Sequence, residues 1–394
     1  MSTLKVSNIQ HENTSDGGIS IDSSGHVSVE GQSLPSAGPL SNRNLIINGA
    51  MQVAQRGTSS TTSNYGTVDR FPCYFTGGAQ TQTQETLTSG DPYNEGSRYF
   101  LRIANTTAST GAGDNRQIMA KLEAQNIAQS GWNYTSSTSY VTVSFWVRAS
   151  VSQEYYGYFH TRDSTEQIYP FSLGTLSADT WTKVTKTVPG NSNITINNDN
   201  GEGMRLVLSP FWGTDYTDSG VSLDTWAAYA SGTRTPDYTN TWAGTTDATF
   251  DVTGVQLEVG QVATPFEHRS YGDELAKCQR YYQMSFTNNP GTTNTSTEGE
   301  VMSGGMANIS TTSHTGAAHI QFQPNMRATP TITTFDKANP RNTDRLHRQT
   351  FGQTGSNNNT ATVANANQQG FSVWSQSGAS ASGIIFQYTA EAEL

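Results

Sequence analysis

Residues 250–267 read FDVTGVQLEVGQVATPFE and carry the alternation of a β-strand. Thr253, Val255 and Leu257 share one phase of a period-two pattern, whereas Gln256 falls in the other phase. A strand of this kind buries one face and leaves the other in water, and the proline that follows it ends the pairing. The segment therefore predicts a half-buried strand that closes a β-domain.

Residues 44–57 read NLIINGAMQVAQRG, and we expect them to form the opening edge of the same domain. Together the two segments resemble the jelly-roll modules of bacteriophage tail fibres and related virion appendages. In that family a near-identical closing phrase runs into a short helix that ends in Arg-Tyr-Tyr. Here residues 274–282 read ELAKCQRYY, which fits that continuation. The resemblance covers most of residues 44–282, with a shorter match at residues 320–333, and it implies a jelly roll similar to carbohydrate-binding modules.

The composition favours an all-β chain. With 394 residues the chain is long enough for two or more domains. Only 34% of the residues are hydrophobic and 14% are charged, against about 25% charged in an average globular protein. The 37 glycines and the many Thr, Ser and Asn residues indicate short strands joined by polar turns.

The charge and the cysteines exclude several classes of protein. A net charge of −10 without a basic run argues against a nucleic-acid partner. It also opposes steering of the protein towards bare anionic lipopolysaccharide, unless divalent ions or local contacts intervene. No apolar run approaches the roughly 18 residues of a membrane span, so we expect no membrane insertion. Cys73 and Cys278 are too few for a disulfide framework, and we expect both to be reduced and buried.

Changes in composition divide the chain into four segments. These are an attachment segment and linker at residues 1–40, a jelly-roll β-sandwich at 41–268, a short helical junction at 269–283 and a smaller distal β-sandwich at 284–394. In the first segment, residues 19–22 and 26–30 alternate around a turn and predict a hairpin. An isolated hairpin is marginal in water, so we expect it to pair with its own copies or with a virion protein.

Further elements follow from the same patterns. Strands are predicted at residues 97–103, 141–147, 154–160, 182–188, 204–208, 371–374 and 384–388, and one short helix at 121–128. Because long helices do not alternate with these strands, a sandwich is favoured over a parallel sheet. Residues 352–369 consist almost entirely of Gly, Ser, Asn, Thr, Ala and Gln, which predicts an exposed loop.

We expect no enzymatic activity. Glycoside hydrolysis needs two carboxyl groups that flank the bond, and the close pairs Asp215 with Asp218 and Asp247 with Asp251 lie among turn residues. Aspartate in a turn usually bonds to its own backbone. The chain also lacks the coil-by-coil repeat expected of a β-helix depolymerase and a Gly-x-Ser-x-Gly nucleophile turn.

One metal ligand is nominated through the resemblance. Carbohydrate-binding jelly rolls often carry a structural Ca²⁺ near their first and last strands, held by carboxylate and carbonyl oxygens. Asp251 on the closing strand is the position that fits, and the alternative is an ordinary exposed aspartate. No other cofactor is expected.

Sugar binding requires aromatic faces among neutral hydrogen-bonding side chains, and residues 211–242 are the richest stretch of this kind. The stretch lies between two strand signals, and long excursions from a sandwich are usually functional or disordered. The candidate carbohydrate-binding residues are Trp212, Tyr216, Trp226, Tyr229, Tyr238 and Trp242. Trp226 has an alternative role as a packing anchor, since residues 224–226 resemble a phrase repeated across the family.

These observations predict a phage tail fibre or receptor-binding structural protein that engages a host surface polysaccharide without covalent chemistry. The family implies a homotrimer, attached to a tail or other virion protein through residues 1–40. Such a protein would be assembled in the host cytoplasm and located in the virion as a tail appendage. A capsid decoration or head-fibre protein is the first alternative, and a polysaccharide depolymerase is the second.

Overall fold

The computed structural model describes residues 6–10, 18–29, 31–35, 41–239, 241–286, 298–304, 314–338, 341–349, 355–376 and 383–394. The chain forms two compact units. The first unit comprises Met1–Gln52, Ser59–Asn64 and Phe71–Arg269. The second comprises Val53–Thr58, Tyr65–Arg70 and Ser270–Leu394, so it includes two segments from far upstream. This division differs from the predicted one, which assigned residues 41–268 to a single domain. Within the described part of the chain, no helix is long and apolar enough to cross a membrane.

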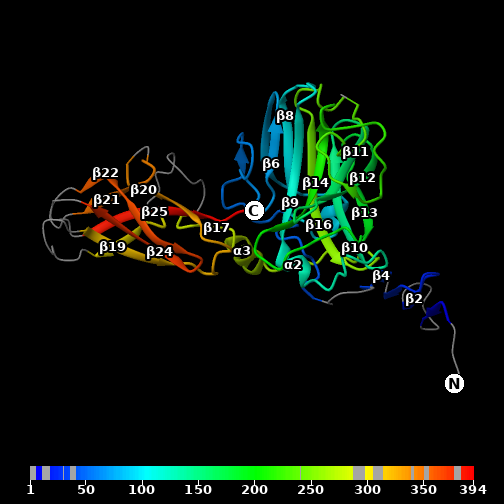
Figure 1. Ribbon diagram of the computed structural model, residues 1–394, viewed down its shortest axis with the longest axis horizontal. Coiled ribbons are helices and arrows are strands. Elements are labelled where there is room, and N and C mark those ends of the chain that lie inside the picture. Colours follow the sequence, from blue (N-terminus) through cyan, green and yellow to red (C-terminus); the bar gives the residue numbers. More distant parts are fainter. Residues whose placement is uncertain are drawn as a thin grey trace, which may run out of the picture. The chain divides into compact units, whose positions relative to one another are not determined.

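The first unit is a β-sandwich of two six-stranded antiparallel sheets (Figure 1). Sheet 1 contains, in spatial order, β13 (Thr182–Pro189), β10 (Tyr140–Ala149), β16 (Thr249–Val259), β8 (Tyr99–Thr107), β7 (Ala79–Thr86) and β5 (Ser59–Ser60). Sheet 2 contains β15 (Ala227–Ala228), β12 (Gln167–Leu176), β11 (Gln153–Thr161), β14 (Glu202–Trp212), β9 (Asn115–Glu123) and β6 (Cys73–Thr76). Two short helices are α1 (Asp91–Asn94) and α2 (Ala124–Ala128). The strands predicted in this region are confirmed, and the predicted helix is confirmed only from Ala124 onward.

Alternation along β11 sets the two faces of sheet 2. Tyr155 and Phe159 are fully buried, and the ring of Tyr155 lies 5.4 Å from that of Phe250 in β16 of the opposite sheet. Tyr158 and His160 occupy the other phase of the strand, because successive side chains point to opposite faces. The outer face of sheet 2 therefore carries Tyr158 and His160.

The predicted adjacency of the opening and closing segments is confirmed. The Leu45 amide donates to the Leu257 carbonyl (2.8 Å), and the Val255 amide donates to the carbonyl of Gly49 (2.9 Å). These bonds span more than two hundred positions of the chain, as expected for the two edges of one domain. The opening segment bonds to β16 only beyond Gly254. The φ of Gly254 is 62°, and this residue lies at a β-bulge in β16.

The half-buried character predicted for β16 is wrong, because both of its faces are buried. Gln256 and Glu258 are 0% and 1% exposed. Their side chains accept hydrogen bonds from the backbone amides of Glu267 (2.7 Å) and Thr264 (2.8 Å), so the polar phase lies under the residues that follow the strand. The bulge also separates Thr253 from the phase of Val255, which a strict period of two could not show.

The leading residues form a small sheet of their own. It contains β1 (Asn8–Ile9), β2 (Ile19–Ile21), β3 (Val27–Val29) and β4 (Gln32–Ser33) in that order. The predicted hairpin is confirmed, since β2 and β3 pair antiparallel with Ile19 opposite Val29. Elsewhere, Cys73 and Cys278 are free and buried, as predicted.

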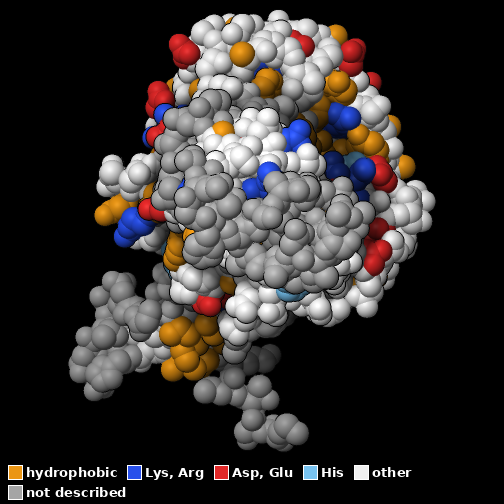
Figure 2. Space-filling view, turned by 90° about the vertical axis from the view of Figure 1, so that its left-hand side faces the viewer, with side chains coloured by type: hydrophobic (Ala, Val, Ile, Leu, Met, Phe, Trp, Pro, Cys, Tyr) orange, Lys and Arg blue, Asp and Glu red, His pale blue; other side chains and the backbone are white. Residues whose placement is uncertain are grey.

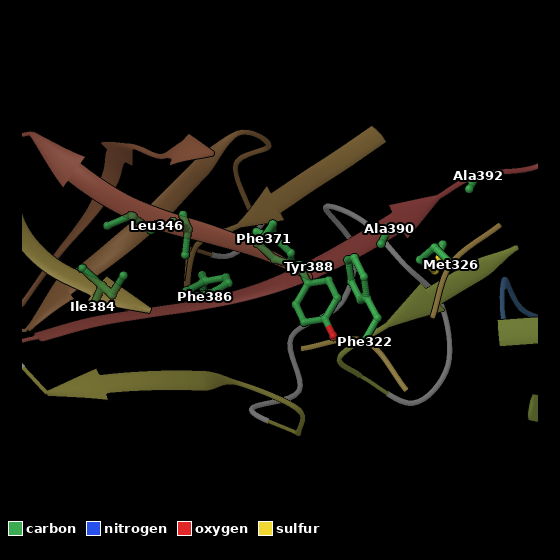
Figure 3. Packing of buried hydrophobic residues seen from close by; sticks show 10 residues of the cluster. Phe322, Met326, Leu346, Phe371, Ile384, Phe386, Tyr388, Ala390 and Ala392 are labelled. Carbon is green, nitrogen blue, oxygen red and sulfur yellow. The ribbon is translucent and has the colours of Figure 1, made fainter. Parts of the chain in front are cut away.

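The second unit contains two antiparallel sheets. One follows the order β17 (Tyr282–Met284), β25 (Gly383–Glu391), β21 (Arg345–Gln349) and β22 (Ser356–Thr360), with β18 (Val301–Gly304) and β20 (Thr331–Phe335) also paired to β25. The other contains β19 (His314–Gln321), β24 (Gly370–Gln376) and β23 (Thr362–Asn367). Figure 3 shows the shared core, in which the ring of Phe371 on β24 lies 5.1 Å from that of Tyr388 on β25.

One prediction for the distal part needs correction. The described part of residues 352–369 is not a loop, because Ser356–Thr360 and Thr362–Asn367 form β22 and β23. Most side chains of β22 are exposed, so this strand needs no apolar phase, and its sequence gives no alternation to detect. The predicted helix is present as α3 (Tyr271–Gln279), where Ser270 caps the N-terminus by accepting from the Asp273 amide (3.2 Å).

The upstream segments of the second unit bring a buried charge cluster with them. Arg70 is paired with Glu393, and Arg56 Nη1 lies 3.3 Å from a Glu393 oxygen. Arg56 also lies 3.7 Å from Asp69. The four side chains are between 1% and 7% exposed. Burial raises the pKa of Asp69 to about 6, although Arg56 opposes the shift. Above that pH the cluster holds two positive and two negative charges.

Candidate functional site

A pocket of about 450 Å³ lies on the outer face of sheet 2 in the first unit. Four strands, β6, β9, β11 and β14, form its base, and the long loop after β14 forms one wall. The volume falls within the range of about 300–1,000 Å³ that is typical of small-ligand sites. We take this pocket as the candidate site.

Strand alternation places the side chains that line it. Strand β9 contributes Asn115, Gln117 and Met119, which are every second residue, and β11 contributes Tyr158 and His160 in the same way. These positions share the outer face because side chains of a strand alternate between faces. The pocket therefore follows from the register of the sheet.

Aromatic rings form the wall beside β14. Trp212 lies 5.0 Å from Tyr216 and 6.5 Å from Tyr158, measured between ring centroids. The ring of Tyr229 stacks on His160 at 4.0 Å. Trp212 is only 3% exposed, so little of its ring surface is open to the pocket.

Two buried polar atoms of the lining have no partner in the described part of the protein. They are Oε1 of Gln117, which can only accept, and Nε1 of Trp212, which can only donate. Gln117 is 6% exposed and Trp212 is 3% exposed. A buried polar group without a partner costs about 1–3 kcal/mol. Hydroxyl groups both donate and accept, so a ligand that carries several of them offers the kind of partner that each atom requires.

Two of the three arginines in the lining are already paired. Arg205 forms a bidentate ion pair with Glu202 (2.6 and 2.7 Å), and Arg162 pairs with Glu166. Burial, with Arg205 and Arg162 nearby, lowers the pKa of His160 to about 3. The imidazole is therefore neutral at physiological pH, and its Nε2 lies 2.7 Å from Glu166.

Arg234 is the third arginine, and it comes from the long loop. Its guanidinium lies 4.4 Å from the ring centre of Trp212 and 4.6 Å from that of Tyr216. Its Nε donates to the Tyr229 hydroxyl (3.1 Å). No carboxylate of the described residues pairs with it. Three aromatic side chains thus hold a guanidinium group whose charge is not neutralised.

The predicted sugar-binding residues divide into two groups. Trp212 and Tyr229 line the pocket. Tyr216 and Tyr238 pack beside the same aromatic cluster without lining the pocket, and the hydroxyl of Tyr238 donates to the Ser209 carbonyl (3.0 Å). The structure therefore brings these four residues to one face of sheet 2.

Trp226 and Trp242 lie outside the pocket. Trp242 is 0% exposed, and its Nε1 donates to the Thr249 carbonyl (3.0 Å), so its assignment to sugar contact is wrong. Trp226 packs against Tyr169 at 5.3 Å and donates to the Pro189 carbonyl (2.7 Å). These contacts correspond to the alternative role of a packing anchor.

Asp251 is not available as a calcium ligand. It is 0% exposed, and Arg102 holds its two oxygens at 2.8 and 2.9 Å. Arg148 adds a third contact at 2.7 Å. Two guanidinium groups thus occupy the positions that a cation would need. Among the described residues, no cluster of His, Cys, Asp and Glu could hold a metal ion.

We therefore predict that calcium does not stabilise the first unit. Because Asp251 is already paired with two cations, adding Ca²⁺ or removing it with EDTA should leave the thermal midpoint unchanged. Differential scanning fluorimetry of the purified chain in both conditions measures this. A thermal midpoint that rises with Ca²⁺ and falls with EDTA would show that the first unit binds calcium.

Sequence reasoning missed most of the lining. Gln117, His160, Arg205 and Arg234 were not among the predicted site residues, although β11 and β14 were predicted as strands. Strands β11, β14 and β9 are neighbours in that order in sheet 2, and this order brings these side chains together. A single sequence does not give the order of strands in a sheet. The outward phase of the predicted strands was the one signal that could have indicated them.

No protein-family model matches the chain, and no curated protein sequence matches it. Among solved structures, it matches the enzymatically active domain of tailspike protein 4 of bacteriophage CBA120 with 7% identity and a TM-score of 0.29, covering 55% of this chain and 21% of that one. It also matches a family 11 carbohydrate-binding module of Clostridium thermocellum in complex with a β-1,3-1,4-mixed-linked tetrasaccharide (10% identity, TM-score 0.24, covering 54% and 99%). A third match is a xylan-binding domain of Paenibacillus barcinonensis (10% identity, TM-score 0.24, covering 54% and 100%).

Proposed function

We propose that this chain is a glycan-binding protein of a phage virion, and that the pocket on the outer face of sheet 2 receives a sugar of the host surface. The observation that carries the proposal is the pair of buried atoms, Gln117 Oε1 and Trp212 Nε1, that lack partners in the described protein. One acceptor and one donor in a single pocket suit a sugar, whose hydroxyl groups serve in both roles.

The rest of the lining supports a sugar ligand. Neutral hydrogen-bonding groups are supplied by Ser63, Thr76 and Asn115, and aromatic rings by Tyr74 and Phe75. Uncharged hydrogen-bonding groups beside apolar ring surface match the mixed polar and C–H surface of a pyranose. On the face of the molecule shown in Figure 2, the described surface is mostly white and orange, and Lys, Arg, Asp and Glu side chains cover a smaller part of it.

We infer that the protein binds without catalysis. The described residues that line the pocket include no Asp or Glu, whereas glycoside hydrolysis needs a pair of carboxyl groups at the bond. Asp218, one of the carboxylates considered in the sequence, accepts from the Gly220 amide (2.7 Å) within a turn. Release of reducing sugar from host polysaccharide would instead favour the depolymerase alternative.

We further propose that the leading segment attaches the protein to the particle. Eight large hydrophobic side chains are exposed among the described residues, and five of them lie between positions 6 and 34. These five are Val6, Ile9, Ile19, Val29 and Leu34. So small a sheet with so much exposed apolar surface needs a protein partner. That partner would be a tail protein of the virion together with the other subunits of a homotrimer.

A trimer would give avidity to individually weak sugar sites, because the second and third contacts become intramolecular. A capsid decoration or head-fibre protein would use the same pocket and the same leading segment. Immunogold labelling of intact particles distinguishes these locations, and label at the tail supports a tail appendage.

The direct test is binding of fluorescent, full-length protein to cells of the phage's host. We expect saturable binding that purified surface polysaccharide inhibits and that lowers phage adsorption. Tyr229→Ala should weaken this binding, since Tyr229 lines the pocket. Trp226→Phe should not, because Trp226 lies outside the pocket. Absence of binding by a well-folded protein, or equal loss in the two variants, would contradict the proposed function.

A further inference from the structure

The charge around the pocket is opposite in sign to the net charge of the chain. The chain carries a net charge of −10, yet the described lining contains three arginines and no carboxylate. Two of these arginines are neutralised by Glu166 and Glu202 next to the pocket. Arg234 alone remains without a carboxylate partner among the described residues. The pocket is therefore a local positive site on an acidic protein.

The environment of Arg234 leaves the outer edge of its guanidinium for a ligand. Nε is occupied by the Tyr229 hydroxyl at 3.1 Å. Trp212 and Tyr216 lie 4.4 and 4.6 Å from the group and support it through cation–π contact. The two Nη groups have no hydrogen-bond partner among the described residues. A guanidinium held in this way presents a planar pair of donors that matches a carboxylate or a phosphate.

We propose that the glycan bound in this pocket is acidic, and that its carboxylate or phosphate group is held by the Nη groups of Arg234. This inference rests on the proposed function and adds the chemical class of the sugar. The neutral part of the sugar then meets Gln117 Oε1 and Trp212 Nε1. Neutral His160 adds no charge that would compete with Arg234 for the anion.

The rest of the protein adds specificity to this arrangement. A chain of net charge −10 repels polyanions at long range, so an acidic glycan binds only where a local contact overcomes that repulsion. Raising the ionic strength should therefore weaken glycan binding through the short-range pairing with Arg234 less than it would weaken glycan binding to a broad basic surface. A single localised contact also selects the position of the anion on the sugar.

The test uses paired probes with the full-length protein. One pair is a hexuronate oligosaccharide and its carboxyl-reduced, neutral form, and the other is a phosphate-substituted polysaccharide and its dephosphorylated form. Titration calorimetry should show at least about tenfold tighter binding of the acidic member of one pair, since a hydrogen bond to a charged group is stronger than a neutral one. The pair that shows the difference identifies carboxylate or phosphate as the source.

Arg234→Gln should remove this preference, so that the acidic and neutral members bind with equal affinity, and thermal unfolding of the variant shows that it is folded. Arg234→Lys should recover only part of the preference, because lysine keeps the charge but not the planar pair of donors. The matched control is Arg98→Gln, an exposed arginine of the same unit that lies 4.1 Å from the ring of Tyr93, and it should behave as wild type.

Equal affinity for acidic and neutral probes, or full preference in Arg234→Gln, would overturn this inference while the proposed glycan binding stands. No binding of any probe would overturn both. The two failures are therefore distinguishable in one set of titrations.

Discussion

Replacing Glu393 with Gln is expected to destabilise the second unit by about 3–5 kcal/mol, the cost of removing one partner from a buried ion pair. Glu393 contacts both Arg56 and Arg70, and all three side chains are at most 7% exposed. Without its charge, Arg70 loses the carboxylate with which it is paired, and Arg56 keeps Asp69 and the half-exposed Glu391. A loss of this size is a large part of the total stability of about 5–15 kcal/mol that is typical of a native protein.

Glu391→Gln is the matched control, because Glu391 also approaches Arg56 (3.6 Å) but is 49% exposed. Exposed ion pairs contribute roughly 0–1 kcal/mol, so this variant should unfold close to wild type. Urea unfolding at a pH above 7, with hydrogen exchange of β25 as the local readout, measures both variants. Equal stability of the two variants would show that the cluster does not support the second unit.

Trp242→Ala is expected to destabilise the first unit by about 3–5 kcal/mol, as is typical when a large aromatic residue is removed from a core. Trp242 is fully buried and donates to the Thr249 carbonyl. The substitution leaves a cavity and an unpaired carbonyl. Thermal unfolding and chemical denaturation measure the loss.

The contrast for this prediction is Trp226→Phe, which keeps an aromatic ring next to Tyr169 and loses one hydrogen bond to Pro189. Its cost should be close to 1 kcal/mol, in the range of about 0.5–1.5 for one hydrogen bond. A Trp242→Ala protein that stays as stable as wild type but loses glycan affinity would show that Trp242 belongs to the binding site after all.

The sequence predicted the frame of the first unit because its signals are local. Period-two runs gave the positions of β10, β11, β13 and β16, and the paired phrases at residues 44–57 and 250–267 gave the closure of the domain. The charge cluster of the second unit could not be foreseen in this way. It joins Arg56 of the opening phrase to Tyr282 of the Arg-Tyr-Tyr phrase, with the guanidinium 3.6 Å from the ring centre. Nothing in either phrase indicates that the two lie next to each other in the fold.

The candidate site was predicted only in part for a similar reason. The excursion after β14 was rich in aromatic residues, and that composition led to Trp212 and Tyr229. Composition does not separate a ring that lines a pocket from one that fills a core, so Trp242 was assigned wrongly. Arg234 lies within the same excursion, but its role depends on having no carboxylate partner among the described residues, which only the three-dimensional arrangement shows.

The measurement that tests the central claim most directly is a comparison of stability and polysaccharide affinity in Trp212→Phe. Phenylalanine keeps a ring in place and removes the buried Nε1–H that has no described protein partner. We predict a thermal midpoint equal to or above that of wild type, because an unsatisfied donor is removed, and an affinity for host surface polysaccharide about fivefold lower, because one hydrogen bond to the sugar is lost. Unchanged affinity in this variant would contradict the assignment of the pocket as the glycan site.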